Sequence, residues 1–293
     1  MPRKLKSSPG LAVIALLAVT ALWGWTFLGT KNAIEQMPVM DFLAIKFAIA
    51  TFVLFIIRPA ALFQITRRCL WHGIVLGFLL GLAYITQTYG LRTVSPAVSG
   101  FITGMGAIFT PVFLWAILRR NISWYVWIAV VLALAGLALL SIHGWAFGMG
   151  EFLTLCCAVF FALQIVGLGE WSHLYSPYEL TFIQIIVATV MCLVAAAPGG
   201  IKLPPDLTTW GAVIIMAVFA TAAAFFIQTW AQALISPTYI AVILTMEPVF
   251  AGCFGVILGG DHLTGRIIIG AICVLAAMLI AQMKTSHKET THR

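Results

Sequence analysis

Charged residues are scarce in this chain, because only 9% of its 293 residues are Asp, Glu, Lys or Arg. A soluble domain ordinarily carries about 25% charged residues, whereas 62% of this chain is hydrophobic. No soluble fold can bury that much apolar surface, so lipid is expected to be the solvent for most of it. The net charge of +7 comes from bases in short loops and tails, which is typical of membrane topology and does not indicate nucleic-acid binding.

Motifs for nucleotide hydrolysis and for common enzyme chemistry are missing too. The sequence has no Walker A loop, which excludes an ATP-driven motor, and no H-E-x-x-H, G-x-S-x-G or acidic metal cluster. Its six cysteines show neither a disulfide framework nor metal-ligand spacing. We therefore expect no cofactor, no metal and no nucleic-acid partner, and a membrane-embedded enzyme is the least favoured alternative.

Ten apolar runs are long enough to span a bilayer, which takes roughly 17 to 25 residues. They cover residues 11–30, 42–57, 71–91, 98–118, 124–142, 152–168, 180–197, 210–234, 239–258 and 267–283. The first run follows a basic N-terminus, as in a signal peptide, but it is long enough to be a retained span. The fold class predicted is an all-α integral membrane protein with ten transmembrane helices.

Basic residues are distributed unevenly between the two sets of loops. They precede the first run and occupy the loops after the second and fourth runs. The alternate loops of this half contain only Lys31 and Arg92. We expect a multi-pass protein of a bacterial inner membrane, and the positive-inside rule predicts that both termini lie in the cytoplasm.

An internal repeat divides the chain. The segment YITQTYGLRTVSPA begins at Tyr84, and FFIQTWAQALISPT begins 141 residues later at Phe225. The repeat predicts a five-helix half over residues 1–145 and a second over residues 146–293. Because five is odd, the second half should enter the membrane from the opposite side, and such inverted repeats place a site near the midplane between the halves.

Prolines recur at matching places in the two halves. Ser95-Pro96 and Ser236-Pro237 are suited to begin helices, since serine is a good N-cap and proline fits the first turn. Pro111 and Pro248 fall inside the fourth and ninth predicted spans, where each is expected to kink its helix. Such kinks serve either function or plain packing. Gly77-x-x-x-Gly81, Gly100-x-x-x-Gly104 and Gly255-x-x-x-Gly259 predict close helix packing.

Glu247 is the first candidate for a functional residue. It follows Pro237 by ten residues, or about 15 Å of helix, which places it near the bilayer midplane. A carboxylate there costs several kcal/mol unless it is paired or protonated. Glu247 is therefore either a carrier of a coupled proton or a structural residue that ties helix ends together.

Lys46 is the second candidate, and three interpretations remain open for it. It lies only about 6 Å inside its span, so its ammonium group can snorkel to the interface. Alternatively it faces a cavity and attracts an anionic group such as a substrate carboxylate. The third interpretation is an ion pair with Glu247.

Uncharged polar and aromatic residues complete the predicted cavity. Gln87 and Gln228 are equivalent in the repeat, and Tyr84 lies on the same helix face as Gln87. Gln164 and Gln184 are further amides within spans, and Trp23 lies in the middle of the first span rather than in an interfacial belt. Each can equally pack or hydrogen-bond between helices. The predicted cavity residues are Trp23, Lys46, Tyr84, Gln87, Gln164, Gln228 and Glu247.

Three motifs resemble the EamA branch of the drug/metabolite transporter superfamily: LWGWTF in the first span, SPAVSGFITGMGAIFTPVF in the fourth and LTMEPVFAGCFGVILGG in the ninth. Members commonly have GE-x-L-T after the fourth and ninth spans. This chain has Gly260-Asp261-His262-Leu263-Thr264 after the ninth, but Arg119-Arg120-Asn121-Ile122-Ser123 after the fourth. Members also often carry Arg in the second span, where Lys46 stands here.

The resemblance implies a secondary transporter with a central cavity and cytoplasmic termini. We expect an exporter of small metabolites such as amino acids, coupled to protons, that acts in the lipid bilayer as a monomer or homodimer. A passive channel or facilitator for small solutes is the alternative.

Overall fold

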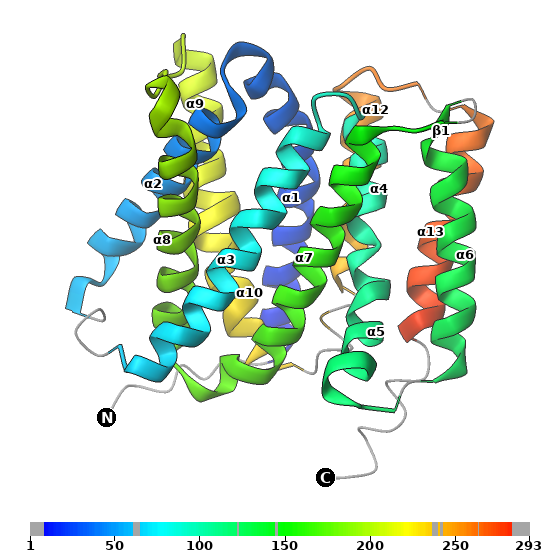
Figure 1. Ribbon diagram of the computed structural model, residues 1–293, viewed down its shortest axis with the longest axis horizontal. Helices are drawn as coiled ribbons and strands as arrows, with labels where there is room; N and C mark the ends of the chain where they lie inside the picture. Colours follow the sequence, from blue (N-terminus) through cyan, green and yellow to red (C-terminus); the bar gives the residue numbers. More distant parts are fainter. Residues whose placement is uncertain are drawn as a thin grey trace.

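The computed structural model describes residues 9–60, 65–121, 123–143, 146–235, 240, 243–262 and 264–282 (Figure 1). These residues are helical almost throughout. The exception in regular structure is a short antiparallel pair, β1 (Ile142–His143) and β2 (Ala146–Phe147), in which Ile142 faces Phe147. The chain is therefore an all-helical bundle, as the composition predicts.

Within the described parts of the chain, seven runs of helix are long and apolar enough to cross a membrane. Five are α1 (Pro9–Gln36), α2 (Val39–Ile57), α3 (Arg67–Gly90), α7 (Met149–Trp171) and α8 (Pro177–Ala196). The sixth joins α4 (Pro96–Gly104) to α5 (Gly106–Leu118). The seventh joins α9 (Leu207–Ile215), the π-helix η4 (Met216–Ala223) and α10 (Ala224–Gln232).

Three further apolar helices are shorter in the part of the chain that is described. They are α6 (Trp124–Ser141), α12 (Met246–Ile257) and α13 (Gly265–Gln282). Single 3₁₀ turns, η2 (Ser172–Leu174) and η3 (Ala197–Gly199), follow α7 and α8. The prediction of a multi-pass helical membrane protein is confirmed, and the count of ten spans stays a prediction.

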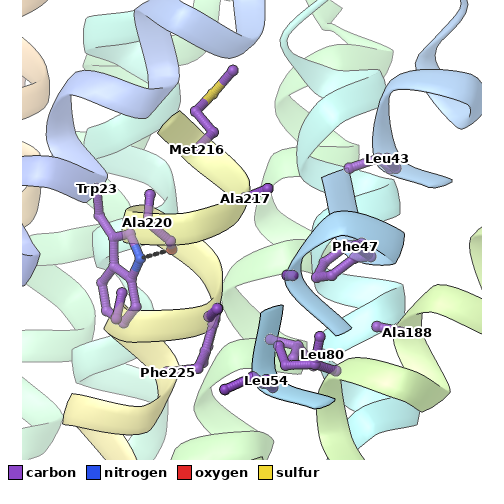
Figure 2. Close-up of a cluster of buried hydrophobic side chains, with 14 of the residues drawn as sticks. Trp23, Leu43, Phe47, Leu54, Leu80, Ala188, Met216, Ala217, Ala220 and Phe225 are labelled. Atoms are coloured by element: carbon purple, nitrogen blue, oxygen red, sulfur yellow. Dashed lines mark hydrogen bonds between the residues drawn. The ribbon is translucent and has the colours of Figure 1, made fainter. Parts of the chain in front are cut away.

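The outer surface of the bundle is apolar along its length. Large hydrophobic side chains such as Ile14, Phe52 and Val131 are each more than 60% exposed. Exposing so many apolar side chains to water would be unfavourable, so lipid tails are the solvent that suits this outer surface. The buried side chains instead form an interior cluster between α1, α2, α8 and η4, part of which is drawn in Figure 2.

Side chains secure several helix ends. Ser95 Oγ accepts from Val98 N at the start of α4, with Pro96 in the first turn, as predicted; Ser236 and Pro237 lie outside the described residues. Asp206 caps α9 by accepting from Thr209 N at 2.8 Å, and this hydrogen bond lowers the pKa of the Asp206 carboxyl below its ordinary value. Lys31 Nζ donates to the carbonyl oxygens of Leu91 (2.8 Å) and Val94 (3.0 Å), beyond the end of α3.

Helices from opposite halves of the sequence lie against each other. The chief pairs are α1 with α12, α2 with α8, α3 with both α7 and α8, and α6 with α13. Glycines permit the closest approaches: a Cβ on Gly77 would lie 2.7 Å from Gln184 O, and one on Gly24 would lie 2.8 Å from Ala251 N. This interleaving brings residues distant in sequence to the centre of the bundle.

Candidate functional site

A cavity of about 60 Å³ lies in the interior, walled by α1, α3, α4, α5, α7, α10 and α12. Its lining comprises Trp23, Thr26, Phe27, Tyr84, Gln87, Thr103, Gly104, Gly106, Ala107, Thr110, Phe161, Ile165, Phe225, Gln228, Leu244 and Glu247. Trp23 lies halfway along α1, so this cavity is at mid-depth in the bundle. A larger hollow of about 480 Å³ lies where α1 ends and α9 begins, at the edge of the bundle.

Helix interruptions meet at the central cavity. Between α4 and α5, the Met105 N–H bonds to the carbonyl of Ile102, three residues back. The π-helix η4 passes into α10 just before Phe225, and α12 begins one residue before Glu247. Non-helical or loosened backbone at membrane depth is tolerated where it is buried in protein or lines a cavity. This arrangement is typical of discontinuous helices around a transport site.

Four aromatic rings from both copies of the repeat surround the cavity. Trp23 lies 5.3 Å from Phe225 between ring centroids, and Tyr84 lies 5.6 Å from Phe161 and 6.0 Å from Phe225. Tyr84 and Phe225 are equivalent in the repeat, and LWGWTF aligns with FFALQI so that Trp23 corresponds to Phe161. The two halves thus supply matching rings to one site.

The two equivalent amides also lie on this wall. Gln87 Nε2 donates to Thr103 Oγ1 at 3.3 Å. Gln228 is 3% exposed, and its Oε1 has no hydrogen-bond donor among the described residues. A buried amide oxygen without a donor is costly, which makes Gln228 a group able to accept from a ligand or water.

Among the described residues of the cavity lining, Glu247 is the one carboxylic acid. Its carboxylate has no ion pair and no hydrogen bond among the described residues. The ion pair that the described residues do contain joins Arg120 to Glu170 on the surface, at 2.8 Å. Glu247 occupies the first turn of α12, where the helix dipole favours a negative charge. The helix end therefore supports the carboxylate while its oxygens remain available to the cavity.

Lys46 lies behind the cavity wall rather than on it. The side chain is 3% exposed, and its Nζ lies 3.9 Å from the ring centroid of Tyr84, 4.9 Å from that of Phe47 and 5.3 Å from that of Phe42. Aromatic faces attract an ammonium at these distances. Neither snorkelling to the interface nor an ion pair with Glu247 describes this position.

Gln164 also lies outside the cavity lining. Its Nε2 donates to Gln184 Oε1 at 2.9 Å, and Gln184 Nε2 donates to the carbonyl of Leu180 at 3.1 Å. Both amides are fully buried. The pair joins α7 to α8, which is the helix-to-helix alternative that the sequence left open.

The two predicted kink prolines occupy different positions. Pro111 lies inside α5, and the interruption of its span falls earlier, at Met105. Pro248 is the third residue of α12, and its missing N–H removes the helical partner of the carbonyl of Leu244. Residues 243–244 are also helical, and Thr245 interrupts the helix just before α12. This interruption resembles the one at Met105, and the two kinks stay predictions.

Trp23 has a contact that sequence reasoning missed. Its Nε1 donates to the carbonyl of Ala220 at 2.8 Å, within the π-helix η4 (Figure 2). A π-helix widens the turn and often marks a functional position. The small-residue segment ATAAAFF gives no recognised signal for this irregularity. The sequence also did not single out Thr26, Phe27, Thr103, Thr110, Phe161 or Phe225 as lining residues, although Phe161 and Phe225 fall in the aligned repeats.

Metal-binding clusters of three or more His, Cys, Asp or Glu side chains do not occur among the residues that the structure describes. The cavity combines aromatic rings, hydroxyls and amides with a single carboxylate. Such a lining is suited to hold and orient a small amphipathic molecule.

Comparisons with known proteins agree with this architecture. The model of the EamA-like transporter family matches residues 10–142 and again residues 148–283. An uncharacterized transporter of Archaeoglobus fulgidus is 30% identical over 290 residues, covering 96% of this chain and 87% of that protein. The pseudopaline exporter CntI of Pseudomonas aeruginosa is 22% identical over 268 residues, covering 90% of this chain and 94% of the exporter.

One crystal structure shares the fold, with a TM-score of 0.67 at 17% identity, over 93% of this chain and 97% of the other. The resemblance carried by the motifs in the first, fourth and ninth predicted spans is thereby confirmed. Since the family model accounts for nearly the whole chain in two successive matches, the protein belongs to the EamA-like transporter family.

Proposed function

We propose that this protein is a secondary active carrier that exports small metabolites such as amino acids across a bacterial inner membrane. One observation carries the proposal: a mid-depth cavity walled by equivalent residues of two sequence copies, Trp23 with Phe161, Tyr84 with Phe225, and Gln87 with Gln228. Sites between repeated halves are typical of carriers that alternate between two openings.

The pattern of helix neighbours supports an inverted repeat in two halves, residues 1–145 and 146–293. If the first to fifth spans correspond to the sixth to tenth, the contact of α1 with α12 has its counterpart in α7 with α4 and α5. Likewise the contact of α3 with α8 corresponds to that of α2 with η4. The pairs α2–α8 and α6–α13 each join two equivalent helices, so exchanging the halves leaves these contacts unchanged. In Figure 1 α1 runs upward and α7 runs downward, as an odd number of spans per half requires.

The proposed direction of transport, export rather than uptake, rests on similarity to a named exporter. The match to CntI covers 94% of that protein, which is named an exporter of pseudopaline. Basic residues on one set of loops support cytoplasmic termini. Amino acids remain the substrate class suggested by the family resemblance.

Carrier action is favoured over a passive channel by the size of the cavity. Its volume of about 60 Å³ is well below the roughly 300–1,000 Å³ of ordinary ligand pockets. A metabolite can therefore enter only if the walls move, which is a step of alternating access and is not needed in an open pore.

Glu247 is the residue proposed to couple transport to protons. Its carboxylate faces the cavity without a protein partner among the described residues, so protonation and substrate binding can compete for it. Lys46 and Gln164 lie outside the lining in this conformation and are proposed to support the cavity walls.

Proteoliposomes containing the purified protein test the carrier proposal. They are loaded with a mixture of amino acids and amines, and efflux and counterflow are measured with and without a pH gradient. Saturable efflux that is accelerated by external substrate is expected. Glu247→Gln should abolish the response to the gradient while the protein still inserts, and the surface variant Glu170→Gln should retain it. Efflux no faster than from protein-free vesicles, or single-channel currents, would overturn the proposal.

A further inference from the structure

We infer that the cavity selects amphipathic organic cations, namely amines with an apolar body and no carboxylate, over zwitterionic amino acids. This inference rests on the proposed carrier function and, among the small metabolites proposed there, ranks amines above the amino acids that the family resemblance suggests. It follows from which charges the described structure places on the lining and which it places behind it.

The first step concerns the charge on the cavity wall. Glu247 is the only Asp, Glu, Lys, Arg or His among the lining residues that the structure describes. Its carboxylate has neither a cation nor a hydrogen-bond donor among the described residues. A desolvated carboxylate is most stable when it is paired with a positive charge. An ammonium group of the substrate supplies both that charge and the N–H donors.

The second step concerns the aromatic rings. Trp23, Phe161 and Phe225 line the same cavity as Glu247. Trp23 and Phe225 lie with their ring centroids 5.3 Å apart, so their rings form one continuous wall. Aromatic faces attract organic cations, tryptophan most strongly, and they also pack against an apolar body. The lining therefore stabilises both ends of an amphipathic amine.

The third step concerns the cation that a zwitterion would need. The carboxylate of an amino acid requires a positive partner in a site that excludes water. Lys46 is a buried cation of the second span, but its Nζ lies against the rings of Phe42, Phe47 and Tyr84, with the Tyr84 ring centroid at 3.9 Å. Tyr84 itself lines the cavity whereas Lys46 does not. A bound amino acid would thus bury its carboxylate with only uncharged hydroxyls and amides of the lining as donors, which disfavours it relative to the matching amine.

Three probes with the same phenylethyl body test this selectivity. Phenethylamine is a cation, phenylalanine is a zwitterion and 3-phenylpropionate is an anion. Each is titrated calorimetrically into the purified wild-type protein in lipid nanodiscs at pH 7. We expect phenethylamine to bind at least about tenfold more tightly than phenylalanine, and 3-phenylpropionate to bind most weakly.

Variants of the cavity acid then locate the interaction. Glu247→Gln keeps the shape of the side chain and should abolish the preference for phenethylamine, whereas Glu247→Asp should retain most of it. The matched control is Glu170→Gln, which removes a carboxylate from the surface pair with Arg120 and should leave all three affinities unchanged. If Glu247 only stabilises α12, Glu247→Gln lowers the unfolding temperature without changing the selectivity, and that result overturns the inference. The wild-type series decides the question even if the Glu247→Gln protein fails to fold.

Transport separates a failure of the inference from a failure of the proposed function. Counterflow of the permanently charged N,N,N-trimethyl derivative of phenethylamine is measured in proteoliposomes, because this probe cannot leak through the bilayer as a neutral base. The derivative has no N–H donor, so it tests the positive charge and the aromatic contacts. Saturable counterflow of the cation supports both proposals. Counterflow of phenylalanine with equal or greater efficiency overturns the inference and leaves the carrier function intact. No counterflow of any probe or metabolite overturns both.

Discussion

Trp23 joins the first half of the chain to the second through one hydrogen bond. Its indole N–H donates to the carbonyl of Ala220 in η4, and its ring packs beside Phe225. A single such bond contributes about 0.5–1.5 kcal/mol, and loss of the donor leaves a buried carbonyl unpaired. The same side chain lines the cavity, so it couples the cavity to the irregular helix.

Trp23→Phe is predicted to lower both stability and transport. The phenyl ring keeps the packing against Phe225 but cannot donate to Ala220. We expect a loss of about 0.5–1.5 kcal/mol in unfolding free energy, measured by thermal unfolding in nanodiscs, and slower counterflow. Trp71→Phe, at a side chain that is 59% exposed, is the control; equal behaviour of the two variants would contradict the role given to the hydrogen bond.

Lys46→Met is predicted to leave stability unchanged or to increase it. A lysine costs about 2.5–3.5 kcal/mol at the centre of a membrane helix and less toward its end, whereas cation–π contacts recover about 2 kcal/mol when desolvated. Methionine fills a similar volume and packs well on aromatic rings. The measurement is the unfolding midpoint in nanodiscs. A drop equivalent to more than about 2 kcal/mol would mean that the aromatic cage depends on the ammonium more strongly than these magnitudes allow.

At the scale of the helices, α1 and α12 approach closely enough to exclude a side chain. A Cβ on Gly24 would lie 2.5 Å from Phe250 Cβ and 2.8 Å from Ala251 N. The second of these is backbone, so the clash cannot be relieved by rotating a side chain. Small residues at such contacts drive helix association in membranes, where hydrophobicity does not.

Gly24→Ala is therefore predicted to separate α1 from α12 and to destabilise the protein by about 1–3 kcal/mol. Gly211→Ala makes the same chemical change in α9, where nothing lies within 4 Å of the added Cβ, and it should be neutral or slightly stabilising because alanine favours helices. Thermal unfolding and the yield of monodisperse protein report the difference. If both variants unfold alike, the close contact is not a determinant of stability.

At the scale of the whole molecule, each half of the chain packs chiefly on the other. Helix α1 lies on α12, α2 on α8 and α3 on α7, so neither half buries its apolar faces without its partner. A carrier built in this way can open toward either side through small rotations of one half against the other. The mid-depth cavity is where such rotations would change access.

Site-directed labelling tests the predicted inversion. Single cysteines are placed at Arg68, at the start of α3, and at Lys202, in the loop between α8 and α9. Both positions are exposed, and they lie at the connections between the second and third spans of the two copies. In intact cells a membrane-impermeant maleimide should label the cysteine at 202 and spare the one at 68, and in inverted vesicles the pattern should reverse. The unsubstituted protein reports labelling of the native cysteines. Labelling of both positions from one side would contradict the inverted arrangement.

The sequence alone determined that lipid surrounds most of the chain, that the fold is a helical membrane bundle and which family it belongs to. The shortage of charge and the apolar runs require a helical membrane protein, because lipid cannot hydrogen-bond an open backbone. The recurrence of the Tyr84 segment at Phe225 indicated the repeat, and LWGWTF, SPAVSGFITGMGAIFTPVF and LTMEPVFAGCFGVILGG indicated the family. These features are local or periodic along the chain, so they are readable without coordinates. They also indicated Tyr84, Gln87, Gln228 and Glu247, which share one cavity lining.

Only the tertiary structure decided which polar groups share a wall. Gln164 has the same chemistry as Gln228, yet it bonds to Gln184 between α7 and α8. Lys46 was compatible with three positions, and the packing of Phe42, Phe47 and Tyr84 placed it behind the cavity. The π-helix η4, whose Ala220 carbonyl accepts from Trp23, could not be predicted from its stretch of small residues. The physical reason is that the facing of a side chain inside an apolar bundle depends on how helices rotate against each other, and that rotation is set by contacts between residues far apart in sequence.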